Sequence, residues 1–139
     1  MNKHILMVED FPVMQKFYKD ALEQAGYHLA LAGDGEEALE MVAQKEYDII
    51  LLDLLLPKVN GIQFLERFNN RPATTKIIVL TDFSDEGRTE RARELGVNEY
   101  LIKSEYPPSE LVKKLNQLNG IPEKETGPET PESPQAPAA

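Results

Sequence analysis

Ionisable and hydroxyl side chains stand at the ends of four of the five apolar segments of this chain. They are Glu9 and Asp10 after the first segment, Asp53 after the third, Thr81 after the fourth and Lys103 after the fifth. Carboxylates brought together repel one another unless a cation lies among them, and hard oxygen ligands suit a divalent ion such as Mg²⁺. Lys103 could then pair with an anion held there, and the Thr81 hydroxyl could donate a hydrogen bond to it. These residue types therefore indicate the handling of a phosphoryl group beside a metal ion.

The five apolar segments are rich in β-branched residues and alternate with segments of helical periodicity. The expected strands are 5–8, 28–32, 48–52, 76–80 and 99–102. This alternation is typical of repeated βα units around a parallel sheet, in which ligands bind outside the carboxyl ends of the strands. Residues 49–52 are apolar at every position, which predicts a central strand covered on both faces. The candidate site residues therefore all fall at the same edge of the predicted sheet.

Apolar residues at helical spacing predict five helices around these strands. They are expected around 14–22, from 34 onward, around 62–68, over 85–95 and around 111–118. Asp10 could, besides binding a metal, cap the helix that begins near Pro12. The helix over 85–95 has only Ala92 and Leu95 as clear apolar anchors, so we expect it to pack weakly.

Composition excludes several classes of protein. The 139 residues contain no cysteine, so disulfides, thiolate zinc sites and cysteine nucleophiles are absent. The net charge of -9 would repel a phosphate backbone, which argues against direct nucleic-acid binding and against attraction to an anionic membrane. No apolar run approaches the roughly 20 residues that cross a bilayer, and no signal peptide is recognisable. A cytoplasmic protein is expected.

The end of the chain differs sharply in composition from the rest. Residues 120–139 hold five of the ten prolines and four acidic residues, with almost no large apolar side chain. Such a segment cannot bury a core of its own. We therefore expect one folded domain over 1–119 and a disordered, Pro/Glu-rich tail over 120–139. The tail could be a solubilising terminus, a docking peptide or the start of a linker to a missing domain.

Four short motifs, in this order and at these strand ends, carry a resemblance to a known family. They are ILMVEDFP, DIILLDLLLPKVNG, IIVLTDFS and EYLIKS. Over residues 3–118 the chain resembles the receiver domain of bacterial two-component response regulators. The resemblance implies an α/β, flavodoxin-like (βα)5 doubly wound fold, with a five-stranded parallel sheet of order 2-1-3-4-5.

The resemblance also implies a role for each site residue. Asp53 would be the phosphoacceptor, attacking a phosphohistidine of a sensor histidine kinase or phosphotransfer protein, or a small phosphodonor. Glu9, Asp10, Asp53 and the backbone carbonyl of Leu55 would bind Mg²⁺, or Mn²⁺ in its place. Lys103 would neutralise the incoming phosphoryl group. Such a protein catalyses only its own phosphorylation and dephosphorylation, so it is not expected to be an enzyme acting on other substrates.

The resemblance also implies that phosphorylation changes the conformation of a partner-binding surface. Thr81 would move to hydrogen-bond the phosphoryl group, and Tyr100 would change rotamer. We expect the output surface to comprise the weakly packed helix over 85–95, the strand over 99–102 and the last helix. No helix-turn-helix follows residue 119, so output is expected through a downstream protein partner or a missing output domain. The chain would be a monomer or a phosphorylation-dependent dimer.

The sequence departs from the family pattern at two positions. Receivers usually have a small residue after the threonine and a proline after the lysine, where this chain has Asp82 and Ser104. A carboxylate at Asp82 would oppose the phosphorylated state unless it faces solvent. Leu55, Asp82 and Phe83 lie where receivers tune their reaction rates, and the two apolar side chains suggest moderate to slow self-dephosphorylation.

Two other functions are weighed against this one. A degenerate receiver would bind partners without phosphorylation, which Asp82 and Ser104 allow but the intact set of site residues opposes. A magnesium-dependent aspartyl phosphatase would need a second aspartate two residues after the nucleophile, where this chain has Leu55, and a cap domain that the chain lacks.

Overall fold

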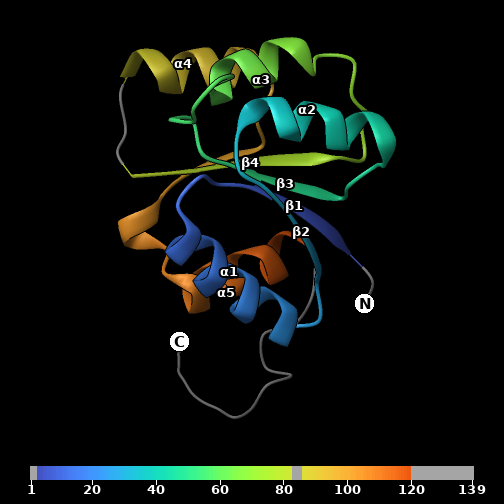
Figure 1. Ribbon diagram of the computed structural model, residues 1–139. Coiled ribbons are helices and arrows are strands. Elements are labelled where there is room, and N and C mark those ends of the chain that lie inside the picture. Colours follow the sequence, from blue (N-terminus) through green and yellow to red (C-terminus); the bar gives the residue numbers. More distant parts are fainter. Residues whose placement is uncertain (1–2, 83–85, 120–139) are drawn as a thin grey trace.

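The computed structural model describes residues 3–82 and 86–119, which form a five-stranded parallel sheet flanked by helices (Figure 1). The strands are β1 (His4–Val8), β2 (His28–Ala32), β3 (Ile49–Leu52), β4 (Lys76–Thr81) and β5 (Glu99–Ile102). Their order in the sheet is β2-β1-β3-β4-β5. The predicted doubly wound topology is confirmed, and each strand lies within one residue of its expected bounds.

Helices cover both faces of the sheet, with α1 and α5 on one face and α2, α3 and α4 on the other (Figure 1). Their bounds are α1 Pro12–Gln24, α2 Gly35–Gln44, α3 Gly61–Arg67, α4 Glu86–Glu94 and α5 Pro108–Leu118. A short 3-10 turn, η1 (Lys103–Glu105), connects β5 to α5. No helix of the described residues is long and apolar enough to span a membrane.

The core lies in two apolar layers, one on each face of the sheet. Successive residues of β3 alternate between the layers: Ile50 and Leu52 pack toward α2 and α3, whereas Ile49 and Leu51 pack toward α1 and α5. All four residues of β3 are buried, as expected for a central parallel strand.

The register of the sheet brings the strand ends to one edge. Val8 pairs with Leu52, Leu52 with Val79, and Thr81 with Ile102. Because β1, β3 and β4 are neighbours, the residues that follow β1 and β3 come close to Thr81. The chain segments around residues 9, 53, 81 and 103 therefore meet, although they are far apart in the sequence.

Helix α4 buries few apolar side chains, as the prediction of few apolar anchors implied. Ala92 is its one buried residue, and Leu95, which follows the helix, is partly buried against the core. Arg91 forms ion pairs with Glu66 of α3 at 3.0 Å and with Glu94 at 3.1 Å, but these side chains are exposed. Exposed pairs of this kind contribute little to stability.

Parts of the sequence-based predictions lie outside the described residues. They are the disordered tail over 120–139, the rate-tuning residue Phe83 and the expected start of the fourth helix at residue 85. The last residue that the structure describes is Asn119, which follows α5, so the predicted domain boundary stays a prediction.

Candidate functional site

Three carboxylates meet at the carboxyl edge of the sheet. One oxygen from each of Glu9, Asp10 and Asp53 lies within 4.8 Å of the other two. Glu9 is 2% exposed and Asp53 is 6% exposed, whereas Asp10 faces solvent. Glu9 and Asp10 follow β1 directly and Asp53 follows β3, so the pairing of these two strands places them together. The acidic cluster predicted from the strand ends is confirmed.

Lys103 projects from the end of β5 into the same cluster. Its Nζ donates to Oε1 of Glu9 at 2.5 Å and to Oδ2 of Asp53 at 3.0 Å, and the side chain is buried. Burial lowers the pKa of Lys103, but the hydrogen bond to Glu9 and the charge of Asp53 outweigh it and raise the pKa above its ordinary value. The ammonium group therefore stays charged within the site.

Burial has the larger effect on Glu9. It raises the pKa of the carboxyl group above its ordinary value, even though the hydrogen bond and charge of Lys103 and the backbone N–H of Phe11 act in the opposite direction. Backbone contacts also hold this residue in place. Its N–H donates to the carbonyl of Ala32, and Nε2 of Gln15 donates to its carbonyl oxygen.

Asp53 is contacted through both carboxylate oxygens. Oδ1 accepts from the Thr81 hydroxyl at 3.2 Å and from the backbone N–H of Leu55 at 3.1 Å, while Oδ2 accepts from Lys103. The carboxylate thus stabilises the turn that follows β3 and also faces the hydroxyl and the ammonium group. Of the residues that the sequence singled out, Thr81 and Lys103 both contact Asp53 through their side chains.

The loop after β3 is fixed by the start of α3. Asn60 caps the helix by a capping box with Gln63, in which each side chain accepts from the backbone N–H of the other. The start of α3 also lies close against the backbone of residues 53 and 54, which only glycine at position 61 permits. A Cβ there would lie 2.6 Å from the Cα of Leu54 and 2.7 Å from the carbonyl oxygen of Asp53. The absence of a side chain at Gly61 thus helps to set the backbone that presents Asp53.

The start of α1 does not use the cap by Asp10 that the sequence allowed as an alternative role for this residue. The helix begins at Pro12, and its N-cap residue is Phe11, with no hydrogen bond from a capping side chain. Asp10 therefore does not cap this helix. Proline at the first helical position has no N–H to satisfy, which lessens the need for a side-chain cap.

The remaining predicted residues lie around this cluster rather than in it. Asp82 is exposed directly after Thr81, and Leu55 is 39% exposed on the loop after β3. Tyr100 lies on β5 and packs against the core layer under α2, α3 and α4. Its hydroxyl is buried and has no hydrogen-bond partner among the described residues.

Two further polar residues, Tyr18 and Arg71, make contacts that sequence patterns did not indicate. Tyr18 of α1 is 1% exposed, and its hydroxyl donates to the carbonyl of Tyr106, just after the turn that carries Lys103. The inward position of Tyr18 follows from helical spacing, but the partner of its hydroxyl, 88 residues away, does not.

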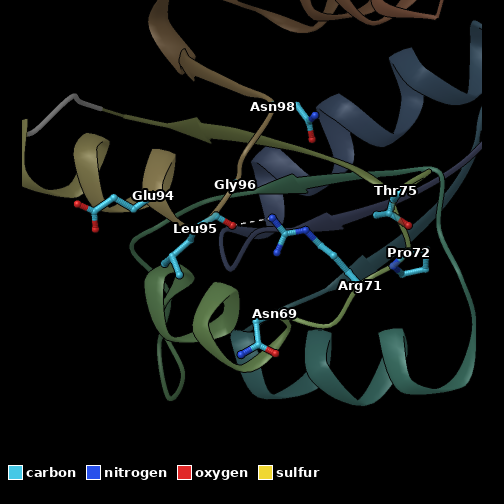
Figure 2. A pocket seen from close by; sticks show the side chains of 9 residues that line it. Asn69, Arg71, Pro72, Thr75, Glu94, Leu95, Gly96 and Asn98 are labelled. Atoms are coloured by element: carbon cyan, nitrogen blue, oxygen red, sulfur yellow. Dashed lines mark hydrogen bonds between the residues drawn. The ribbon is translucent and has the colours of Figure 1, made fainter.

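Arg71 lines a surface hollow at the other end of the sheet (Figure 2). Its guanidinium donates to the carbonyl oxygens of Phe68 at 3.0 Å and Leu95 at 2.6 Å, at the ends of α3 and α4. Burial lowers the pKa of Arg71 from its ordinary value. No residue of the acidic cluster lines this hollow. Arg71 therefore has a structural role, in which it binds backbone carbonyls at the C-terminal ends of α3 and α4.

Comparison with known proteins identifies the family. Residues 5–116 match the model of the response regulator receiver domain. Among curated proteins, the chain is 35% identical over 118 residues to the alkaline phosphatase synthesis transcriptional regulatory protein PhoP of Bacillus subtilis, covering 85% of this chain and 49% of that protein. It is 30% identical over 120 residues to the chemotaxis protein CheY of Thermotoga maritima, covering 86% and 99%. The chain belongs to the response regulator receiver domain family.

Solved structures agree with this assignment. A CheY-like receiver domain from Methanospirillum hungatei matches with a TM-score of 0.79 and 26% identity, covering 85% of this chain and 94% of that one. The receiver domain of the sensor histidine kinase PA1611 from Pseudomonas aeruginosa, solved with a magnesium ion in its active-site cleft, matches with a TM-score of 0.75 and 31% identity, covering 86% and 98%. The chain spans about half the length of PhoP and nearly all of the Thermotoga CheY.

Proposed function

We propose that this receiver accepts a phosphoryl group on Asp53 and thereby switches a protein-binding surface. The observation that carries the proposal is the placement of Asp53, a nearly buried carboxylate that faces the ammonium of Lys103 on one oxygen and the hydroxyl of Thr81 on the other. A carboxylate nucleophile beside a fixed cation and a hydroxyl donor suits phosphoryl transfer, because both groups can bind phosphoryl oxygens.

The transfer forms one bond and breaks one. A carboxylate oxygen of Asp53 attacks phosphorus, and the bond from phosphorus to the imidazole nitrogen of a phosphohistidine breaks, with the imidazole taking up a proton from water. With acetyl phosphate as donor the bond to the acetate oxygen breaks instead. Lys103 balances charge on the phosphoryl oxygens during the transfer. Water later hydrolyses the acyl phosphate to restore Asp53 and release phosphate.

The residues present fit a divalent cation. The cluster holds the three carboxylates of Glu9, Asp10 and Asp53 but one ammonium group, which pairs with Glu9 and Asp53, so an excess of negative charge remains. Together with the Leu55 carbonyl, these carboxylates would hold Mg²⁺ or Mn²⁺, which suit oxygen ligands. When bound, the ion supplies positive charge that offsets the charge of the phosphoryl group. The magnesium ion in the PA1611 receiver supports this part of the proposal.

The switch is proposed to run from Thr81 to Tyr100 and α4. Thr81 and Tyr100 lie on neighbouring strands, and a phosphoryl group on Asp53 would change what the Thr81 hydroxyl binds. The hydroxyl of Tyr100 is buried without a partner in the described part of the chain, which is costly, so its inward position is only weakly favoured. Ala92 is the one residue of α4 that is buried. These features support an output surface made by α4, β5 and α5.

The partners follow from this role. The phosphoryl group would come from a sensor histidine kinase or a phosphotransfer protein. The signal would pass to a downstream protein or an output domain, and not directly to nucleic acid, given the acidic charge. The protein would catalyse only its own phosphorylation and dephosphorylation. It would act as a monomer or as a dimer formed on phosphorylation.

Three residues are proposed to tune the rates. Leu55 is exposed beside Asp53, and Asp82 is exposed after Thr81, while Phe83 is included from its position in the sequence alone. Solvent screens an exposed carboxylate, so Asp82→Ala should raise the phosphorylated fraction only modestly. An unchanged fraction would show that the charge of Asp82 does not reach the phosphoryl group.

Amide NMR with a phosphoryl mimic tests the proposal. The protein is titrated with beryllofluoride and Mg²⁺, beside Asp53→Asn as the matched control. We expect shifts in the wild type alone, at Asp53 and Thr81 and extending to Tyr100. A folded wild-type protein that shows no response would favour the alternative of a degenerate receiver that binds partners without phosphorylation.

A further inference from the structure

We propose that Tyr18 is a positioning residue for Lys103, acting through a hydrogen bond from its hydroxyl to the end of the turn that carries the lysine. This inference rests on the proposed role of Asp53 as phosphoacceptor. It assigns a function to a side chain of α1 that touches neither the carboxylates nor the phosphoryl group.

The turn after β5 offers few places where it can be held. In η1, Ser104 and Glu105 are exposed, so their side chains do not pack against the core. Serine also leaves the backbone free to adopt many conformations, whereas a proline would fix one dihedral angle. The turn is closed by a hydrogen bond from the N–H of Tyr106 to the carbonyl of Lys103 at 3.0 Å.

Tyr18 holds the far end of this turn. Its hydroxyl donates to the carbonyl oxygen of Tyr106 at 3.0 Å, and its ring packs in the core layer between the sheet, α1 and α5. Pro107 and Pro108 follow directly and stiffen the entry into α5. Lys103 is thus fixed at two points: by Glu9 and Asp53 at its ammonium group and by Tyr18 through the backbone.

The hydrogen bond to Tyr106 places the phenol where the charges of the site act on it. Burial raises the pKa of Tyr18, the charge of Lys103 lowers it, and the charges of Glu9 and Asp82 raise it. With a raised pKa the hydroxyl keeps its proton and remains a donor at neutral pH. A phenylalanine at this position would fill the same space but could not bind the Tyr106 carbonyl.

Tyr27 provides a matched control. It is 3% exposed in the same core layer, and its hydroxyl donates to Oδ1 of Asn116 at 2.7 Å and accepts from Nδ2 of Asn119 at 3.2 Å. Tyr27→Phe therefore also removes a buried hydroxyl that binds α5 and its end, but at a place away from the Lys103 turn.

The test is the rate of phosphorylation by acetyl phosphate with saturating Mg²⁺, followed by mass spectrometry. We expect Tyr18→Phe to slow the reaction about five-fold, the effect of losing one positioning hydrogen bond, and Tyr27→Phe to leave the rate near that of the wild type. Circular dichroism and urea unfolding verify that both variants fold. Equal rates for the two variants would overturn the inference while leaving the proposed function intact.

A double-mutant cycle separates positioning from a general effect on the fold. If Tyr18 acts through Lys103, Tyr18→Phe should have no further effect on the rate in the Lys103→Ala background, measured at high acetyl phosphate. A five-fold loss that persists without Lys103 would contradict the inference. If the wild-type protein does not react at all, the proposed function fails and this inference fails with it.

Amide exchange supplies a second readout that does not depend on the reaction. The N–H of Tyr106, which donates to Lys103, should exchange faster in Tyr18→Phe than in the wild type or in Tyr27→Phe. Unchanged exchange at Tyr106 would show that the Tyr18 hydroxyl does not hold the turn, and would overturn the inference even if the phosphorylation rate fell.

Discussion

The ammonium group of Lys103 lies 3.0 Å from Oδ2 of Asp53, although the two residues are 50 positions apart. Glu9 takes part in the same contact, so one cation serves two buried carboxylates. This position gives Lys103 two roles. It offsets acidic charge in the resting protein, and it is in place to meet a phosphoryl group on Asp53.

Removal of the Lys103 ammonium group should lower the stability of the protein, and Mg²⁺ should reverse this loss. Lys103→Ala leaves Glu9 and Asp53 buried without their countercharge, so we expect the free energy of unfolding to fall by about 3 kcal/mol in metal-free buffer. Mg²⁺ binds the folded state and should restore most of the loss. Urea unfolding with and without Mg²⁺ measures both effects.

Lys114→Ala is the control for this prediction, because Lys114 pairs with Glu99 at 3.7 Å in a more exposed setting. Its loss should change the free energy of unfolding by less than about 1 kcal/mol, with no dependence on Mg²⁺. The account would be contradicted by a Lys103→Ala variant that is as stable as the wild type without metal.

Thr81→Ala should uncouple the site from the output surface. With beryllofluoride and Mg²⁺, amide shifts should remain around Asp53 but disappear at Tyr100 and α4, because the hydroxyl that contacts Asp53 is gone. Thr75→Ala is the control, since Thr75 donates to the Tyr47 carbonyl at 2.8 Å and is also buried, before β4 begins. Persistence of the Tyr100 shifts in Thr81→Ala would disprove this route.

Tyr100→Phe should stabilise the protein. The Tyr100 hydroxyl is buried without a partner among the described residues, so removing it relieves a desolvation cost of about 1 kcal/mol. Tyr27→Phe, which loses a paired hydroxyl, should lower the free energy of unfolding by a similar amount. A loss of stability in Tyr100→Phe would mean that its hydroxyl has a partner in solution.

Alkaline titration should separate the buried tyrosines from the unfolded chain. Burial raises the pKa of Tyr18, Tyr27 and Tyr47 above the ordinary value of 10.0. The folded state therefore binds more protons than the unfolded state above this pH, so stability falls as the pH rises. The chain has no tryptophan, so its near-ultraviolet absorbance reports the ionisation of tyrosine directly. Tyrosinate absorbance should appear at higher pH in the folded protein than in urea. Coincident curves would contradict these shifts.

The sequence predicted the fold and the acidic cluster because both depend on local patterns. Runs such as 49–52 specify buried strands, and the polar residue directly after each strand necessarily falls at the carboxyl edge of a parallel sheet. Glu9, Asp53 and Lys103 could thus be expected to meet before any contact was known. The predicted metal ligands and the phosphoacceptor role of Asp53 stay predictions that the experiments described here test.

What could not be predicted depends on contacts between distant residues. Helical spacing places Tyr18 in the core but does not reveal that its hydroxyl reaches Tyr106. His4 and His28 begin β1 and β2, but only the register of the two strands shows that their rings stack, with centroids 4.7 Å apart. The cap by Asp10, which the sequence allowed as an alternative role, is not formed, because whether a side chain reaches the helix end depends on the local backbone.

Mass spectrometry of the intact protein after incubation with acetyl phosphate and Mg²⁺ tests the central claim most directly. The account predicts that the wild type gains one phosphoryl group, that hydroxylamine removes it as expected of an acyl phosphate, and that a chelator prevents the gain. Asp53→Asn, which keeps the size of the side chain but not its charge, should gain none. A folded wild-type protein that stays unmodified, or an equal gain in Asp53→Asn, would contradict the assignment of Asp53 as the phosphoacceptor.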